Sequence, residues 1–432
     1  MKNRLLETLW PSSLDARPFA STAFANAALA AIGLLTGTLA ARMLGAEGRG
    51  ELAAAQAWPL FLATLGSFGL TEAIAYFAAQ APSRARAALA TGLLLAVPFT
   101  VLAVAAGLWL LPRMLRGQAT EVQQIALLSL ALVPLLTLSV APSQALRGVG
   151  HFRSWNALRL ITPLAWLATL MAVQGTSHAN VPTLARGFIG ATGLAACVSH
   201  VYAWRMLSGP SAPNRHLVRP MLAYSTPTMM AAMPQWLNLR LDQLIMIVVL
   251  DTRSLGLYVV AMAWSTAVQP LATVIAHGAV PALAGAQDSH RKARLVYRAG
   301  AAVAIATSLV VLTATPLMLP LIFGAEFRSA LPAALVLVIA SGITSLNSVG
   351  AECLRGLGRP RSVLRAECVG LAVTAIALPA LIPLAGIVGA ACASVLAYSA
   401  TLIVQRRQLR TPGENAVIDV TAGVPPTLDP VA

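Results

Sequence analysis

Long apolar stretches constrain this chain more than any other feature. They recur along nearly all of its 432 residues, and each runs for roughly 18 to 28 residues, which is enough to cross a bilayer as a helix. Because hydrocarbon offers the backbone no hydrogen-bond partner, we expect these segments to be helical. A composition that is 57% hydrophobic and 10% charged, with a mean hydropathy of +0.74, excludes an ordinary soluble domain.

The stretches predict an all-α polytopic membrane protein with about twelve transmembrane helices. The first stretch lacks the cleavage site of a signal peptide and is followed by many others, so we interpret it as a structural span. The spans are expected at residues 19–42, 51–79, 87–111, 122–143, 156–174, 184–206, 220–250, 256–284, 299–323, 330–354, 363–383 and 385–405.

The basic residues predict how these spans are oriented. With the amino terminus in the cytoplasm, 22 of the 30 Lys and Arg residues fall on the cytoplasmic side, 7 on the other side, and Arg240 within a span. Since positively charged loops stay in the cytoplasm, both termini are expected there. The net charge of +15 is spread over short loops and forms no single stripe, which argues against nucleic-acid binding.

The second half of the chain repeats the first. Residues 146–154 match residues 354–362 at six of nine positions, and a similar offset aligns Gly50 with Gly256. An even number of spans in each unit gives both units the same orientation, so we predict two parallel six-helix repeats. The predicted divisions are a cytoplasmic segment (1–18), an N-lobe (19–206), a cytoplasmic linker (207–219), a C-lobe (220–406) and a disordered cytoplasmic tail (407–432).

Four groups of residues resemble motifs of a known family. Residues 42–50 read Arg-Met-Leu-Gly-Ala-Glu-Gly-Arg-Gly, similar to a family motif Arg-x-Leu-Gly-Pro-Glu-x-x-Gly, with Ala46 in place of the proline. Residues 242–245 (Asp-Gln-Leu-Ile) and residues 256–261, which begin Gly-Leu-Tyr and end in Ala, match two further motifs. The Leu-Arg-Gly-x-Gly loops of the repeat also fit. On these motifs the chain resembles the polysaccharide and oligosaccharide flippases, such as Wzx-type O-antigen flippases, of the multidrug/oligosaccharidyl-lipid/polysaccharide (MOP) exporter superfamily.

This resemblance implies a fold, a substrate and partners. The fold would be a MATE/MOP-type pair of V-shaped lobes that alternately open a cationic cavity to either face. The substrate would be a polyprenyl-pyrophosphate-linked glycan, carried outward for the synthesis of cell-surface polysaccharide such as lipopolysaccharide. Membrane lipids and polysaccharide-assembly proteins would be the other partners.

Polar residues inside the seventh span are the main candidates for a binding site. An ionisable group at membrane depth costs roughly 2.5 to 3.5 kcal/mol, so each one suggests a function. Gln235, Asn238 and Asp242 share one helical face, and Arg240 lies on a neighbouring face. Arg240 either binds substrate phosphate through its guanidinium fork or extends to the outer headgroups. Asp242 is either a structural hydrogen-bond acceptor or a cation-coupling site.

Other ionisable residues complete the set of candidates. Glu72 in span two and His277 in span eight are cavity candidates, although Glu72 could be held in an ion pair and His277 could be a packed neutral histidine. Arg147 and Arg355 end spans four and ten and could guide anionic headgroups or anchor the bundle in the cytoplasmic leaflet. The four cysteines show no metal-ligand spacing, so neither a metal nor any other cofactor is expected.

Several other functions are compatible with a polytopic membrane protein. An ATP-driven pump is disfavoured, because neither Lys2 nor Lys292 lies in a phosphate-binding loop motif. An enzyme, such as a membrane glycosyltransferase or polymerase, would need a sizeable extramembrane loop to carry its chemistry, and all internal loops here are short. A MATE-like, ion-coupled multidrug exporter and a lipid II flippase remain alternatives, although lipid II flippases commonly carry two additional helices.

Overall fold

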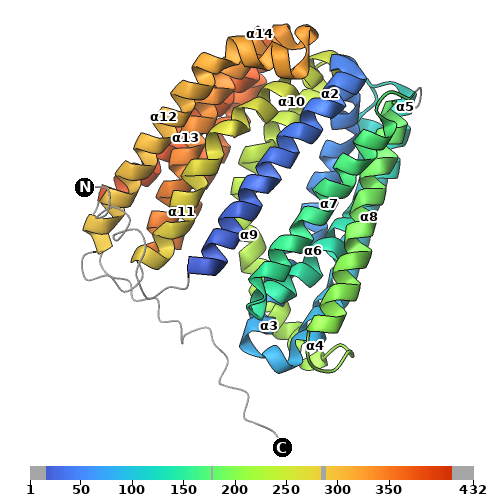
Figure 1. Cartoon of the computed structure of the whole chain (residues 1–432), viewed down its shortest axis with the longest axis vertical. Helices are drawn as coiled ribbons and strands as arrows, with labels where there is room; N and C mark the ends of the chain where they lie inside the picture. The colour runs from blue at the N-terminus through green and yellow to red at the C-terminus, as the bar shows by residue number, and fades with distance from the viewer. Residues whose placement is uncertain (1–15, 177–178, 284–288, 411–432) are drawn as a thin grey trace, which may run out of the picture.

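The computed structural model describes residues 16–176, 179–283 and 289–410, and within these ranges the chain is helical and has no strand (Figure 1). The α-helices of the first half are α2 (Ala16–Ser67), α3 (Leu70–Gln80), α4 (Ala85–Met114), α5 (Thr120–Ser129), α6 (Leu132–Gly148), α7 (Phe152–Val173) and α8 (Val181–Met206). Those of the second half are α9 (Arg215–Val249), α10 (Thr252–Ser265), α11 (Gln269–Leu283), α12 (Ser289–Phe323), α13 (Leu331–Gly356) and α14 (Pro360–Arg410). Short 3-10 turns are η1 (Pro82–Arg84), η2 (Thr266–Val268) and η3 (Ala325–Ala330).

The predicted all-α architecture of about twelve spans is confirmed. The described residues contain nine stretches that are long and apolar enough to cross a membrane. Two of these hold two spans each, because α2 bends at Gly45 and α14 bends at Ala385 and Gly386. The polar helix α9, which is 35 residues long, supplies the remaining pass.

The helices are less regular than the predicted spans. Span two is interrupted where Phe68 and Gly69 adopt positive φ angles of 47° and 68°, which starts α3 as a new helix. Span four divides into α5 and α6, and span eight divides into α10 and α11 around η2. Hydrophobicity alone predicts a crossing but carries no information on such breaks.

The two repeats fold alike at the loops that share sequence. His151 N–H donates to the Leu146 carbonyl (2.9 Å), and Arg359 N–H donates to the Leu354 carbonyl (2.8 Å). Gly150 and Gly358 take positive φ angles of 86° and 74° at the same place in each loop. These are the hydrogen bonds and the left-handed glycine of a Schellman helix end, which explains why the sequence repeats there.

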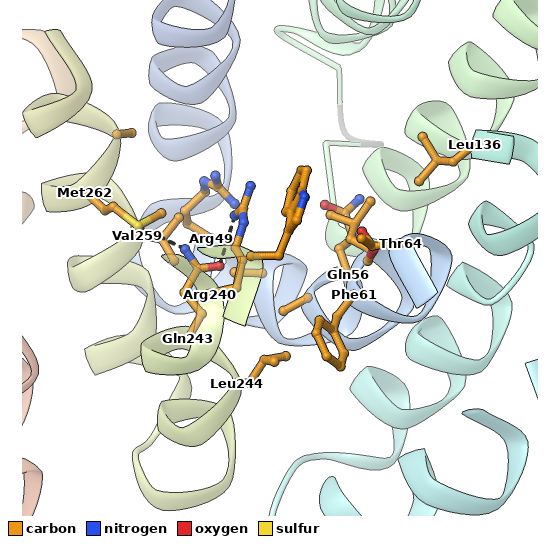
Figure 2. Close-up of a pocket in the computed structure, with 15 residues that line it drawn as sticks. Arg49, Gln56, Phe61, Thr64, Leu136, Arg240, Gln243, Leu244, Val259 and Met262 are labelled. Carbon is orange, nitrogen blue, oxygen red and sulfur yellow. Dashed lines mark hydrogen bonds between the residues drawn. The ribbon is translucent and has the colours of Figure 1, made fainter. Parts of the chain in front are cut away.

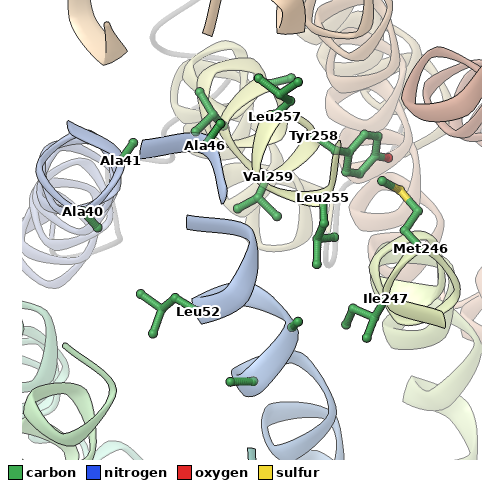
Figure 3. Close-up of a cluster of buried hydrophobic side chains, with 14 of the residues drawn as sticks. Ala40, Ala41, Ala46, Leu52, Met246, Ile247, Leu255, Leu257, Tyr258 and Val259 are labelled. Atoms are coloured by element: carbon green, nitrogen blue, oxygen red, sulfur yellow. The ribbon is translucent and has the colours of Figure 1, made fainter. Parts of the chain in front are cut away.

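Buried side chains show where the lobes are joined. We call the end of the bundle at which α2 bends the Gly45 end, and the end at which α2 begins the Ala16 end. The largest hydrophobic cluster draws on both halves of the chain around the α2 bend, and Figure 3 shows Ala46 and Leu52, which follow the bend in α2, near Val259 of α10. The smaller clusters each belong to one side: one to α3, α4 and α6–α9, and two to α11–α14. The lobes therefore share a core at the Gly45 end and have separate cores elsewhere.

Helix α9 contacts both lobes in turn. Near its start, Asn214 N–H donates to the Thr91 hydroxyl of α4 (2.8 Å), and Tyr224 stacks on Tyr76 of α3 with ring centroids 4.4 Å apart. Near its end, Asn238 and Thr374 of α14 are hydrogen-bonded (2.5 Å). Three prolines, at positions 220, 227 and 234, lie along the helix and each removes an intrahelical hydrogen bond. A kinkable helix thus connects the first lobe to the second.

Candidate functional site

A cavity of about 360 Å³ lies between the two halves of the chain. One wall is the second arm of α2, which presents side chains at helical spacing from Arg49 through Gln56 to Thr64. The facing residues come from α9 and α10, and Leu136 of α6 closes one side. The full lining is Arg49, Ala53, Gln56, Ala57, Leu60, Phe61, Thr64, Leu136, Trp236, Arg240, Gln243, Leu244, Val259, Met262 and Ala263.

Two arginines carry the only formal charges among the described residues that line the cavity. Figure 2 shows Arg49 and Arg240 side by side, with Gln56 and Thr64 across the cavity. The Arg49 Nε is buried and has no hydrogen-bond partner among the described residues. Arg240 reaches the amide oxygen of Gln243, at 3.5 Å. The ion pairs found in the described ranges lie elsewhere, so neither guanidinium forms an ion pair with a described carboxylate.

Gln243 connects Arg240 to the cavity wall. Its side-chain amide donates to the Met262 sulfur of α10 at 3.1 Å, while its oxygen faces Arg240 (Figure 2). Across the cavity, the Gln56 Nε2 is buried without a partner in the described part of the chain. Adjacent like charges and unsatisfied N–H donors in a partly apolar space favour an anion with several oxygens, and guanidinium matches phosphate oxygens with paired hydrogen bonds.

The other candidates of the seventh span do not line this cavity. Asp242 and Asn238 are both 5% exposed and face other helices. Asp242 Oδ2 accepts a hydrogen bond from the Tyr258 hydroxyl of α10 (2.5 Å), and its Oδ1 accepts one from the Gln243 N–H (2.7 Å). Both carboxylate oxygens are therefore occupied by protein donors. Gln235 is partly buried and is also absent from the lining.

The remaining candidates lie outside the cavity. Glu72 of α3 accepts from Arg147 of α6 at 2.6 Å and from the Gln144 amide at 3.3 Å, so the structure brings a predicted cavity residue and a predicted gate residue together. Arg355 pairs with Glu352 within α13. His277 belongs to α11, but its side chain lies outside the described residues.

Arg49 is a cavity residue that the sequence does not point to directly. Hydropathy places it in the outer loop after the first span, whereas α2 continues through it and turns it into the bundle. The available signal is its spacing: Arg49, Ala53, Gln56 and Leu60 recur at three or four residues along one helical face.

Solved structures of membrane transporters share this fold, a helical bundle that makes about twelve membrane passes. The chain is similar to a structure described as lipid II flippase MurJ in an inward closed conformation, with a TM-score of 0.74, 12% identity and coverage of 92% of this chain and 88% of that one. It is also similar to an inward-facing multidrug resistance MATE family transporter of the MOP superfamily (TM-score 0.65, 12% identity, coverage 90% and 98%). A third similar structure is the MATE multidrug transporter DinF-BH (TM-score 0.61, 14% identity, coverage 92% and 96%).

The sequence itself identifies the family. Residues 39–332 match the model of a family described as polysaccharide biosynthesis protein. This is more than half of the chain, and the protein belongs to that family. No curated protein matches the sequence.

Proposed function

We propose that this protein is a flippase that carries polyprenyl-pyrophosphate-linked oligosaccharide across the bacterial inner membrane for cell-surface polysaccharide synthesis. The observation that carries the proposal is the pair of arginines, Arg49 and Arg240, which form no ion pair with a described carboxylate and lie in a cavity whose described lining contains no acid. A pyrophosphate supplies the oxygens that two guanidiniums require. The family, whose description is polysaccharide biosynthesis, supports a glycan-linked substrate.

The positions of the hydrophobic cores support an inward-facing state. The Gly45 end holds the shared core, and the Ala16 end holds a separate core for each lobe. With the amino terminus in the cytoplasm, as the basic loops predict, the Gly45 end is the outer end. The lobes would then be closed toward the outside and able to admit a lipid-linked substrate from the cytoplasmic side.

A multidrug exporter of the same fold is the alternative that the MATE structures raise. A site for cationic drugs would be expected to carry carboxylates, because opposite charge raises the local concentration of the substrate. The lining residues that the structure describes include none, and the membrane-embedded Asp242 is turned away and hydrogen-bonded. The charge of the cavity therefore favours an anionic headgroup over a cation.

Binding to purified protein in nanodiscs tests the proposal. The ligands are undecaprenyl pyrophosphate and undecaprenol, which differ only in the charged headgroup. We expect the wild type to prefer the pyrophosphate, and we expect Arg49→Ala and Arg240→Ala each to lower that affinity by about 10-fold or more, as loss of a charge-assisted hydrogen bond would.

Arg113→Ala is the matched control. Arg113 is exposed near the end of α4, where its guanidinium carbon lies 4.2 Å from the centroid of the Trp109 ring in the same helix. It does not line the cavity. Removing it changes the net charge equally and should leave binding unchanged. Equal affinity of the Arg49 and Arg240 variants and the wild type for the pyrophosphate would refute the site.

A further inference from the structure

The first residue of the family-like motif, Arg42, joins the two lobes. Its Nε donates to the Ile322 carbonyl at 2.7 Å, and its Nη2 donates to the Leu321 carbonyl at 2.6 Å. Arg42 belongs to the first arm of α2, and both carbonyls belong to the last turn of α12, which ends at Phe323. Carbonyls in a last turn lack helical N–H partners, and a helix C-terminus attracts positive charge.

A second donor makes the same kind of contact nearby. The Gln118 side-chain amide, in the turn between α4 and α5, donates to the Ile247 carbonyl at 3.1 Å. Ile247 lies in the last turn of α9, which ends at Val249. In both cases a side chain from the first half of the chain caps the end of a helix from the second half.

Backbone also approaches backbone closely just after the α2 bend, where α2 crosses α10. A Cβ on Gly50 would overlap the Thr252 carbonyl oxygen of α10, and a Cβ on Gly256 would overlap the Ala46 carbonyl oxygen of α2. Gly50 and Gly256 are the positions that the sequence repeat aligns, so the repeats meet at equivalent points. Such close approach leaves no space for water between the lobes at this crossing.

The contact made by Arg42 has no counterpart in the sequence of the second repeat. The repeat offset of 206 to 208 places Arg42 opposite Val248, Val249 and Leu250, none of which can donate from a side chain. At the Gly45 end, the charged contact of Arg42 adds to the shared hydrophobic core, the Gln118 contact and the glycine crossing in holding the lobes together.

We propose that Arg42 is a latch that holds the lobes closed at the Gly45 end and must release the α12 carbonyls before that end opens. The acceptors are backbone carbonyls, which water can satisfy equally after release, so the contact is reversible. The proposal depends on the lobes separating at this end during transport and not on which substrate is carried. The proposal gives a role to Arg42, the first residue of the motif, which does not line the cavity.

The distance between the lobes at the Gly45 end tests the proposal without any substrate. Cys197, Cys353, Cys368 and Cys392 are first replaced, because all four are free. Spin labels are placed at the exposed positions Glu47 of α2 and Ser329 of η3, and their separation is measured by double electron–electron resonance on protein in nanodiscs. We expect the wild type to show mainly a short distance. Arg42→Ala should raise the ratio of long to short distances by about tenfold, and Arg42→Lys by less.

Three further variants make the result decisive. Gly256→Leu, which cannot fit at the crossing, shows that the label pair reports opening. Arg113→Ala removes an outer arginine that stacks on its own helix and should not change the distances. If Arg42→Ala fails to fold, Gln118→Ala should still lengthen the distance in the same direction. Wild-type distances in folded Arg42→Ala, with a response from Gly256→Leu, would overturn the proposal.

Discussion

At the scale of single residues, helix α9 separates two kinds of polar side chain. Arg240 and Gln243 face the cavity, whereas Asp242 is buried against α10 and accepts hydrogen bonds from Tyr258 and from the backbone. Because protein donors satisfy both oxygens of Asp242, we propose that it has the structural role, one of the two roles that the sequence left open. It joins the end of α9 to α10 within the second lobe.

Tyr258→Phe tests this assignment. The substitution leaves the buried Asp242 Oδ2 without its donor, which costs about 1 to 3 kcal/mol. We expect a lower apparent Tm of the purified protein and unchanged transport per folded molecule. Tyr202→Phe is the matched control, because the Tyr202 hydroxyl makes an exposed contact with Ser154 (2.9 Å) and should change the Tm little. A loss of transport in Tyr258→Phe without a loss of stability would instead favour a coupling role for Asp242.

At the scale of helices, glycine determines how closely spans approach. A Cβ on Gly148, in the last turn of α6, would overlap the Ala75 carbonyl oxygen of α3, whereas nothing lies within 4 Å of a Cβ on Gly190 in α8. The Glu72–Arg147 ion pair lies beside the Gly148 contact. Close packing of α3 on α6 thus positions that pair.

Gly148→Ala should separate the two helices and lower stability by about 1 to 3 kcal/mol, as overpacking in a core does. Gly190→Ala should be neutral or should stabilise the helix by up to about 1 kcal/mol, because alanine is the better helix former. Thermal melting of both variants in the same detergent checks the difference. Equal Tm values would contradict the close contact between α3 and α6.

At the scale of the whole molecule, the sequence predicts the architecture better than the site. Apolar length predicts the twelve passes, and the shared offset predicts the two repeats, including the loops that end in Gly150 and Gly358. The sequence does not predict the helix break at Phe68, because packing sets the φ angles there and hydropathy carries no information on that packing. Arg49 escapes prediction for a similar reason, since only the continuation of α2 through the Gly45 bend turns it into the cavity.

Proteoliposome flipping tests the proposed function most directly. Purified protein is reconstituted with a fluorescent polyprenyl-pyrophosphate oligosaccharide and, in parallel, with a cationic dye. Movement across the bilayer is followed for three proteins: the wild type, the double variant Arg49→Ala/Arg240→Ala, and Arg113→Ala. We predict that the wild type and Arg113→Ala flip the lipid-linked sugar alone and that the double variant flips it at least about 10-fold more slowly. Transport of the dye alone, driven by a sodium or proton gradient, would contradict the flippase function and make the protein a multidrug exporter of the same fold.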